Sequence, residues 1–224
     1  MKPNILFKSL LAAAALIASN AAQAQLFTNT FSYTANLAIP DNNLNGVSDT
    51  RTVVSEIFSI TGVRVTLNIS GGFNGDYYAY LTHDSGFAVL LNRVGRTISS
   101  DLGYPDSGFN VVLNDAAAND IHTYRLSLNP NGGPITGSWQ PDGRNIHPAI
   151  SLDTTARTAG LDVFDDLDAN GNWTLFLADV SAASTATLNS WGLEIVGVPE
   201  PSTWALLAMA GVGLWWRFRR HAGK

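Results

Sequence analysis

The stretch Val63-Arg64-Val65-Thr66-Leu67-Asn68-Ile69 decides the fold class of this chain. Apolar and polar side chains alternate strictly along it, and the apolar ones on one face are Val63, Val65, Leu67 and Ile69. A period of two residues is typical of a β-strand with one buried face, whereas an amphipathic helix repeats every 3.6 residues or so. We therefore predict a strand at residues 63–69 that packs its apolar face on a core.

Short β-branched or aromatic runs recur on both sides of this strand. They lie at residues 77–81, 88–91, 109–113, 173–177 and 188–196. Clusters of Gly, Asp, Asn and Pro between the runs predict turns at residues 71–76, 84–86, 105–108, 129–133, 141–143 and 170–171. The sequence of the same region shows no helical periodicity of three turns or more. This spacing predicts an all-β fold, a β-sandwich or jelly roll.

The aromatic residues divide into expected core positions and expected surface positions. Trp173 and Trp191 lie in strand patterns beside leucines, and we expect both in the core. Trp139 lies in the turn-like segment Gly-Ser-Trp-Gln-Pro-Asp-Gly, and Tyr78 alternates away from Tyr77, so we expect both rings to be exposed. Because an exposed ring can stack on the face of a sugar, Trp139 and Tyr78 are the candidate glycan contacts.

The charge of residues 25–197 limits the classes of partner. This span is long enough for one sizeable core, and we expect a single domain. It contains seven Arg and no Lys against fifteen Asp and two Glu, a net charge of −10, which argues against nucleic acid and anionic lipid as partners. The chain has no cysteine, so stability must come from the core, from turns or from a bound metal.

The N-terminus has the three parts of a secretory signal peptide. Lys2 and Lys8 make it basic, and residues 10–18 form an apolar segment. Ala22 and Ala24 make a small-x-small cleavage site. We therefore expect residues 1–24 to be removed and the chain to be exported.

The C-terminus carries a second signal. The motif Pro199-Glu200-Pro201-Ser202 precedes an apolar run at residues 203–216 and a basic cluster made of Arg217, Arg219 and Arg220. The run is shorter than the roughly 20 residues that span a bilayer comfortably. We therefore expect one hydrophobic helix that holds the chain in the inner membrane provisionally, with the arginines on the cytoplasmic side.

These residues closely resemble the PEP-CTERM sorting signal of Gram-negative bacteria. The resemblance implies recognition by an exosortase, a membrane transpeptidase that cuts near the motif and discards the helix, whereas the alternative is an ordinary C-terminal anchor. The expected organisation is a signal peptide at 1–24, a β-sandwich domain at 25–197 and a sorting signal at 198–224. The expected route leads from an inner-membrane intermediate to the cell surface or the extracellular space.

The domain itself resembles the P domain (P/Homo B) of proprotein convertases and bacterial subtilases across residues 37–196. The motifs that carry the resemblance are Ile39-Pro40-Asp41-Asn42, Gly46-Val47-Ser48, the strand at 63–69, Gly75-Asp76-Tyr77, the segment 90–95, Asn170–Leu175 and Leu188–Trp191. The resemblance implies a galactose-binding-like jelly roll of about eight strands. In convertases this module packs on a subtilisin-like domain. No such domain precedes it in this sequence, so we expect it to act alone.

Two loops carry half of the EF-hand pattern for calcium. Asp166, Asp168 and Asn170 stand at alternate positions before a glycine, and Asp41-x-Asn43-x-Asn45-Gly46 repeats the pattern, but neither loop has the final Glu. Carboxylates from elsewhere in the sandwich, such as Asp76 or Asp179, would have to complete a site. A structural Ca²⁺ and ordinary Asx-turns are the two alternatives.

We do not expect catalysis. Asp84-Ser85-Gly86 beside His83, and Asp106-Ser107-Gly108, lack the Gly-x-Ser-x-Gly elbow and fall where turns are predicted. The scattered histidines make no zinc signature. Two functions stay open: a structural or adhesive module of the extracellular matrix, and an accessory domain that acts in trans on a secreted subtilase or binds exopolysaccharide.

Overall fold

The computed structural model describes residues 26–199, which form nine β-strands and four short 3-10 helices. The strands are β1 (Phe27–Ile39), β2 (Val47–Val53), β3 (Ile57–Gly71), β4 (Tyr77–His83), β5 (Gly86–Asn92), β6 (Phe109–Leu113), β7 (Ile135–Trp139), β8 (Gly171–Asp179) and β9 (Ala186–Pro199). The 3-10 helices are η1 (Asn74–Asp76), η2 (Ile121–Leu126), η3 (Pro148–Ile150) and η4 (Leu161–Phe164). The prediction of a mostly β fold is confirmed.

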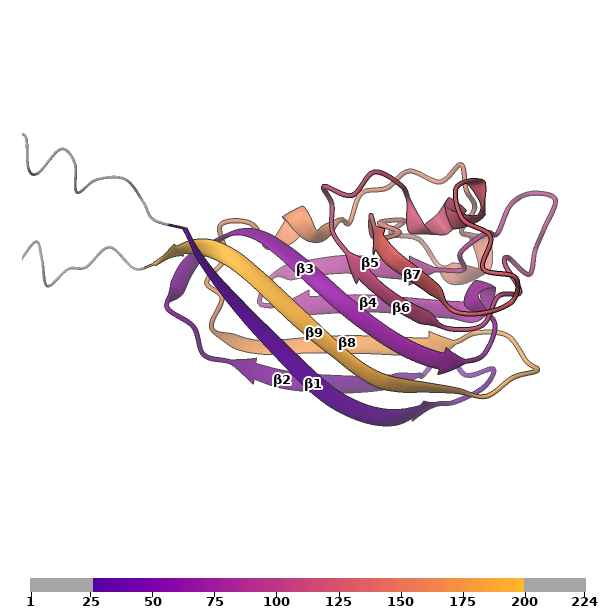
Figure 1. The fold of residues 1–224 in the computed structure, drawn as a ribbon, viewed down its shortest axis with the longest axis horizontal. Helices are drawn as coiled ribbons and strands as arrows, with labels where there is room; N and C mark the ends of the chain where they lie inside the picture. The colour runs from indigo at the N-terminus through magenta and orange to yellow at the C-terminus, as the bar shows by residue number, and fades with distance from the viewer. Residues whose placement is uncertain (1–25, 200–224) are drawn as a thin grey trace, which may run out of the picture.

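The strands form two sheets that lie one behind the other (Figure 1). The five-stranded sheet has the order β1-β9-β3-β6-β7, and the four-stranded sheet has the order β2-β8-β4-β5. All neighbours are antiparallel except β6 and β7, which run parallel. Phe27 of β1 pairs with Gly197 of β9, so the first and last strands enter and leave the fold at the same end of the sandwich.

The core lies between the two sheets and is built by strand alternation. The apolar face predicted at 63–69 is buried in β3, and Trp191, Leu193 and Ile195 are buried in β9. Trp173 of β8 is buried from the other sheet. The Trp191 indole Nε1–H donates to Asp49 Oδ2 of β2 over 2.7 Å and so connects the two sheets.

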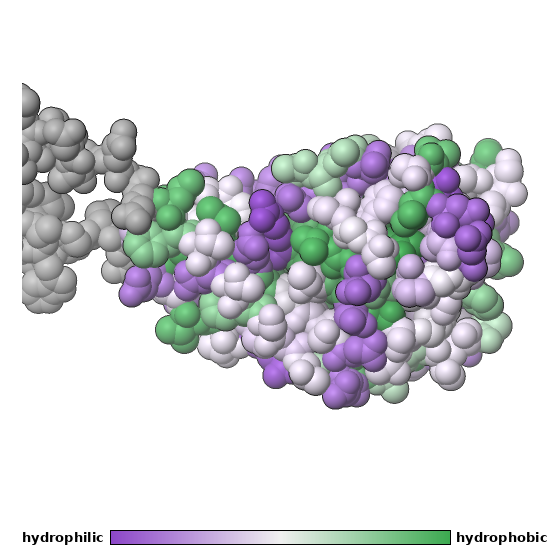
Figure 2. All heavy atoms as spheres, viewed as in Figure 1, coloured by the Kyte–Doolittle hydropathy of each residue, from purple (hydrophilic) through white to green (hydrophobic). Residues whose placement is uncertain are grey.

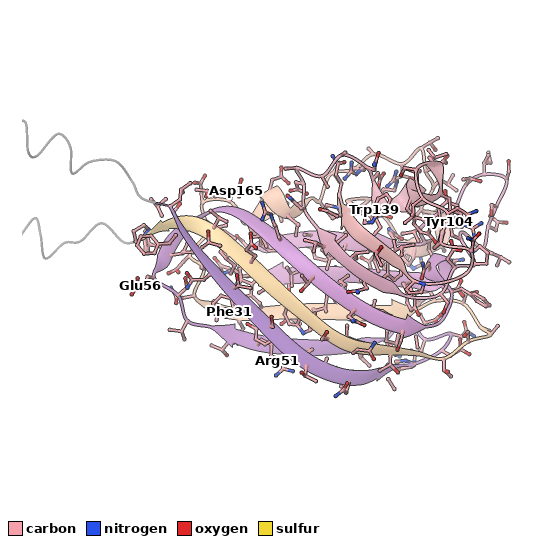
Figure 3. All side chains as sticks on the ribbon, viewed as in Figure 1. Phe31, Arg51, Glu56, Tyr104, Trp139 and Asp165 are labelled. Atoms are coloured by element: carbon pink, nitrogen blue, oxygen red, sulfur yellow. The ribbon has the colours of Figure 1, made fainter. Side chains whose placement is uncertain are left out.

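The expectation of an exposed Trp139 is wrong. Trp139 is only 5% exposed, because it is the last residue of β7 and pairs with Leu113 of β6. Ile135 and Trp139 of this strand are buried, and the three residues between them, which include Gly137, are exposed. Its Nε1–H donates to the carbonyl oxygen of Thr136 over 2.9 Å, so this ring is no glycan contact. Figure 3 shows its position within the fold.

Candidate functional site

The outer face of the four-stranded sheet carries a row of aromatic side chains. Alternation along β4 buries Tyr77 against the core and leaves Tyr78 and Tyr80 half-buried on the opposite face, as predicted for Tyr78. Phe87 of β5 and Phe176 of β8 are half-buried beside them. The sheet therefore presents a contiguous aromatic platform to the outside.

A groove of about 660 Å³ lies on this platform, and we call it the aromatic groove. Its lining residues are Leu44, Asn45, Tyr78, Tyr80, Asn145, Ile146, His147, Pro148 and Phe176. Its volume falls within the range of small-ligand sites. Among these residues, the sequence predicts only Tyr78 as a glycan contact.

Ring packing fixes the floor of the aromatic groove. Tyr80 stands directly opposite Phe176 in the β4–β8 register, with ring centroids 4.6 Å apart and an interplanar angle of 14°. Phe87 supports Tyr80 at 4.9 Å, and the Tyr78 ring lies 5.8 Å from the Tyr80 ring. Burial, with a smaller contribution from Tyr80, raises the pKa of Tyr78. Its hydroxyl group therefore stays protonated at neutral pH and can donate a hydrogen bond.

Amide and imidazole groups form the rim of the aromatic groove. Asn45 and Asn145 are exposed, as is His147, whose Nδ1 accepts from the backbone N–H of Ala149 over 3.2 Å. Asn92 Nδ2 of β5 holds this rim by donating to the carbonyl oxygens of Arg144 and Ile146 over 2.8 and 3.0 Å. The rim is thus fixed to the sheet before any ligand binds.

A buried polar network anchors the segment that leads into this rim. Asp142 is fully buried, and its Oδ2 lies 2.7 Å from His122 Nδ1 and accepts from the backbone N–H of Asn92 over 3.2 Å. Arg144 lies 3.2 Å from Asp142 Oδ1 and 2.9 Å from Asp120 Oδ2. Sequence analysis interpreted residues 141–143 only as a turn, because these partners are distant in sequence.

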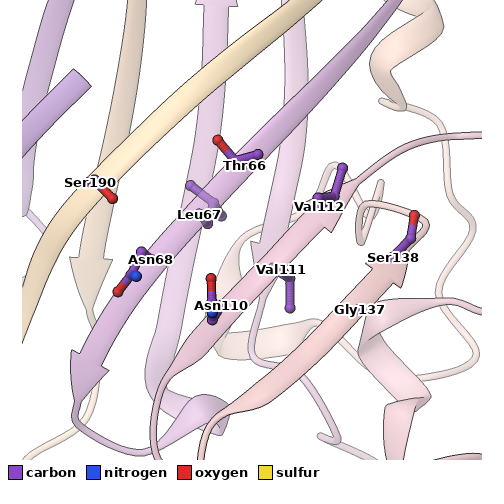
Figure 4. Close-up of a pocket in the computed structure, with 9 residues that line it drawn as sticks. All are labelled: Thr66, Leu67, Asn68, Asn110, Val111, Val112, Gly137, Ser138 and Ser190. Carbon is purple, nitrogen blue, oxygen red and sulfur yellow. The ribbon is translucent and has the colours of Figure 1, made fainter. Parts of the chain in front are cut away.

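A second groove crosses the outer face of the five-stranded sheet (Figure 4) and measures about 270 Å³. The residues that line it are Thr66, Leu67, Asn68, Asn110, Val111, Val112, Gly137, Ser138 and Ser190, of which Leu67 and Val111 turn their side chains into the core. Figure 2 shows this face as a mixture of pale, hydrophilic and hydrophobic residues. This hydroxyl–amide groove offers hydrogen bonds but is not lined by any aromatic ring.

The candidate calcium ligands fall into two groups at opposite ends of β8. In the first, Asp76 and Asp179 are buried, and Asp41 is exposed nearby. The Asn43 N–H donates to the backbone carbonyl of Asp179 over 2.7 Å. Arg93 Nη2 lies 3.9 Å from Asp76 Oδ1.

In the second group, oxygens of Asp168 and Asn170 already accept hydrogen bonds from protein groups. Asp168 Oδ1 accepts from the N–H and the Nδ2 of Asn170 over 2.9 and 2.8 Å, and Asn170 Oδ1 accepts from the Ser55 N–H over 2.7 Å. Asp166 has a positive φ of 66°. Within residues 26–199, no three His, Asp or Glu side chains are placed to hold a metal ion. Calcium binding stays a prediction.

We expect Asp179→Asn to stabilise the protein at neutral pH. Burial, together with Asp76 and Asp41, raises the pKa of Asp179 to about 6. The ionised carboxylate therefore disfavours the folded state above pH 6, and this penalty disappears as the pH falls toward the unfolded value of about 3.9. The isosteric amide should raise the melting temperature by a few degrees at pH 7.5 and by clearly less at pH 4.5. Thermal unfolding at both pH values tests this, with exposed Asp168→Asn as control. An equal gain at both pH values would contradict it.

The histidines and the Asp-Ser-Gly turns have local partners. The His83 ring nitrogens lie 2.6 and 3.1 Å from the carbonyl oxygens of Asp168 and Asn172. His122 contacts Asp142, as described above. Asp84-Ser85-Gly86 joins β4 to β5, as predicted for a turn. Asp106 is buried and bonds to Tyr124 Oη and Arg125 Nε over 2.6 and 2.7 Å.

Comparison with known proteins identifies the C-terminal signal. The PEP-CTERM protein-sorting motif family matches residues 197–220, which indicates an exported protein that is transiently anchored in the membrane and processed by an exosortase-like enzyme. No curated protein matches the chain. Among solved structures, it is similar to the Aeromonas sobria serine protease in complex with its chaperone (14% identity, TM-score 0.46) and to the A. sobria serine protease (15%, 0.44). Each comparison covers 82% of this chain and 29% of the other.

The remaining predicted signals lie outside the described residues. These are the signal peptide with Ala22 and Ala24, the rest of the sorting motif from Glu200 to Ser202, the hydrophobic helix, and the basic cluster at 217–220. In the part that is described, no helix is both long and apolar enough to cross a membrane.

Proposed function

We propose that this exported chain is a non-catalytic adhesive module of the extracellular matrix and binds exopolysaccharide in its aromatic groove. The observation that carries the proposal is the half-exposed row of Tyr78, Tyr80 and Phe176, rimmed by the amides of Asn45 and Asn145. Ring faces pack on the apolar C–H faces of sugars, and amides with phenolic hydroxyls pair with sugar hydroxyls. The groove supplies both kinds of contact.

The charge of the protein favours an uncharged glycan. No Asp, Glu, Lys or Arg lines the aromatic groove, and the net charge of −10 over residues 25–197 repels acidic polymers. The proposal of a non-catalytic role is supported by the local engagement of His83 and His122, which leaves neither ring available to activate a nucleophile.

The jelly-roll topology and the relationship to the P domain are part of this proposal. Their support is the ordered set of motifs, in which Trp173 and Trp191 occupy buried positions on strands of opposite sheets. We also propose that the protein is displayed at the cell surface or released into the matrix after sorting, because the sorting motif indicates export.

The test is binding of the mature protein to matrix polysaccharide from its own host. Tyr80→Ala removes the central ring and should weaken retention in affinity electrophoresis about tenfold, because a stacking contact contributes about 1–1.5 kcal/mol. Tyr78→Ala should have a similar effect. Asn110→Ala, in the hydroxyl–amide groove, is the matched control and should bind like the wild type.

Two results would contradict the proposal. Unchanged binding in folded Tyr80→Ala would exclude the aromatic groove, and loss of binding in Asn110→Ala would move the site to the other sheet. Co-purification of a secreted subtilase, with no glycan retained, would favour the accessory function in trans.

A further inference from the structure

The sorting signal begins inside the fold. Pro199, the first proline of the Pro-Glu-Pro motif, is the last residue of β9 and pairs with Ile57 of β3. Gly197, where the matched family segment starts, pairs with Phe27 of β1. The motif therefore follows the sheet directly, without a linker between the domain and the signal.

A groove of about 420 Å³ opens at this end of the sandwich and includes Pro199, the first residue of the motif. Its lining residues are Ser55, Glu56, Phe58, Asn170 and Pro199. Exposed apolar side chains surround it: Phe58 is 49% exposed, and Val54 is 81% exposed. Figure 2 shows hydrophobic atoms gathered where the chain leaves the fold, and Figure 3 places Glu56 at the same end. We call these residues, with Val54, the sorting-end surface.

Hydrogen bonds hold the sorting-end surface in shape. Asn170 Oδ1 accepts from the Ser55 N–H, and Ser55 Oγ accepts from the Ile57 N–H over 3.0 Å. The Ala169 N–H donates to the carbonyl oxygen of Ile57 over 3.2 Å, and the Trp173 indole N–H donates to Ala169 over 3.0 Å. The surface is thus tied to the core and is preformed.

Chain length places this surface beside the membrane during sorting. Pro199 is separated from Thr203, the start of the apolar run, by four peptide units that reach at most about 14 Å. The headgroup layer alone is about 5–8 Å thick. An enzyme that cuts near Pro-Glu-Pro must therefore approach against the sorting-end surface.

We infer that the sorting-end surface docks the exosortase-like enzyme that processes this chain. An apolar centre with a polar rim is the ordinary composition of a protein interface. Glu56 lies in the surface, and hydrogen bonds to β3 and Ser55 hold the acidic loop with Asp166 and Asp168 next to it. These negative charges would repel anionic lipid headgroups. The inference rests on the sorting motif and not on glycan binding.

The experiment follows processing of the full-length precursor in its native host. Val54→Asp/Phe58→Asp leaves the motif intact and should reduce the rate of conversion to mature protein about tenfold. Mass spectrometry of the mature protein should show ends near Gln25 and Pro199–Ser202. Ile98→Asp/Leu126→Asp is the matched control, because these residues are 89% and 85% exposed at the opposite end of the sandwich. The control should mature normally.

A second variant distinguishes docking of the enzyme on the sorting-end surface from recognition of the Pro-Glu-Pro motif alone. Eight Gly/Ser residues inserted between Gly197 and Val198 move the motif away from the surface and should slow processing as well. The inference would be overturned if the insertion variant is processed at the normal rate or faster. It would also be overturned if the Val54/Phe58 double variant, shown by protease resistance to be folded, is processed normally. Binding of the mature protein to anionic vesicles that is lost in the double variant would also overturn it, because the surface would then belong to lipid.

Discussion

Trp191→Ala should lower the free energy of unfolding by about 3–5 kcal/mol, as is usual when a buried tryptophan is removed. Trp191 is 2% exposed, and its ring packs 4.9 Å from that of Tyr33. Its indole N–H also connects β9 to Asp49 of the other sheet. The substitution therefore removes core volume and a contact between the sheets. At about 2–4 °C per kcal/mol, the melting temperature should fall by about 6–20 °C.

Two further variants identify the cause of this loss. Trp191→Phe keeps most of the ring but removes the indole N–H, one of the two donors to Asp49 Oδ2, so it should cost less, about 1–3 kcal/mol. Leu126→Ala alters an 85% exposed side chain and should stay within about 0.5 kcal/mol of the wild type. Urea unfolding measures all three. A loss in Trp191→Ala no larger than that in Leu126→Ala would show that the ring is not in the core.

Strands with a buried apolar face, the edge strand β5 included, could be predicted from the sequence, whereas the edge strands β1, β2 and β7 are absent from the predicted runs. The runs at 63–69, 109–113 and 188–196 all lie in strands, because each buries one apolar face. β1 and β7 are edge strands whose outward positions carry Thr, Ser, Asn or Gly. β1 carries a period-two pattern in Phe31, Tyr33, Leu37 and Ile39 that is itself typical of a strand, whereas β7 is defined by its pairing with β6. Trp139 of β7 was misplaced for the latter reason.

The candidate site could be predicted only in part. Alternation alone places Tyr78 outward, but the contact of Tyr80 with Phe176 depends on the β4–β8 register, which brings together residues far apart in sequence. The rim at Asn145 and His147 depends on the network around Asp142, whose partners come from β5 and from the start of η2. Local sequence patterns carry no information on such contacts.

Asp142 should be the most costly of the carboxylates to remove from the rim network. Asp142→Ala would remove the acceptor at His122 Nδ1 and one of the two carboxylates that contact Arg144, and breaking a buried ionic contact by removing one partner costs about 3–5 kcal/mol. Asp168→Ala is the matched control, because Asp168 is exposed and bonds only within its own loop, so about 1 kcal/mol is expected.

A double-mutant cycle on the free energy of unfolding, with Asp142 and His122, tests whether Asp142 acts through this network and so supports the aromatic groove. The losses in Asp142→Ala and His122→Ala should not add, and the double variant should be more stable than their sum by about 0.5–3 kcal/mol. Because Asn92 bonds to both Asp142 and the rim carbonyls, folded Asp142→Ala should also bind glycan more weakly at low temperature. Additive losses with unchanged glycan binding would show that the network stabilises the fold without positioning the rim.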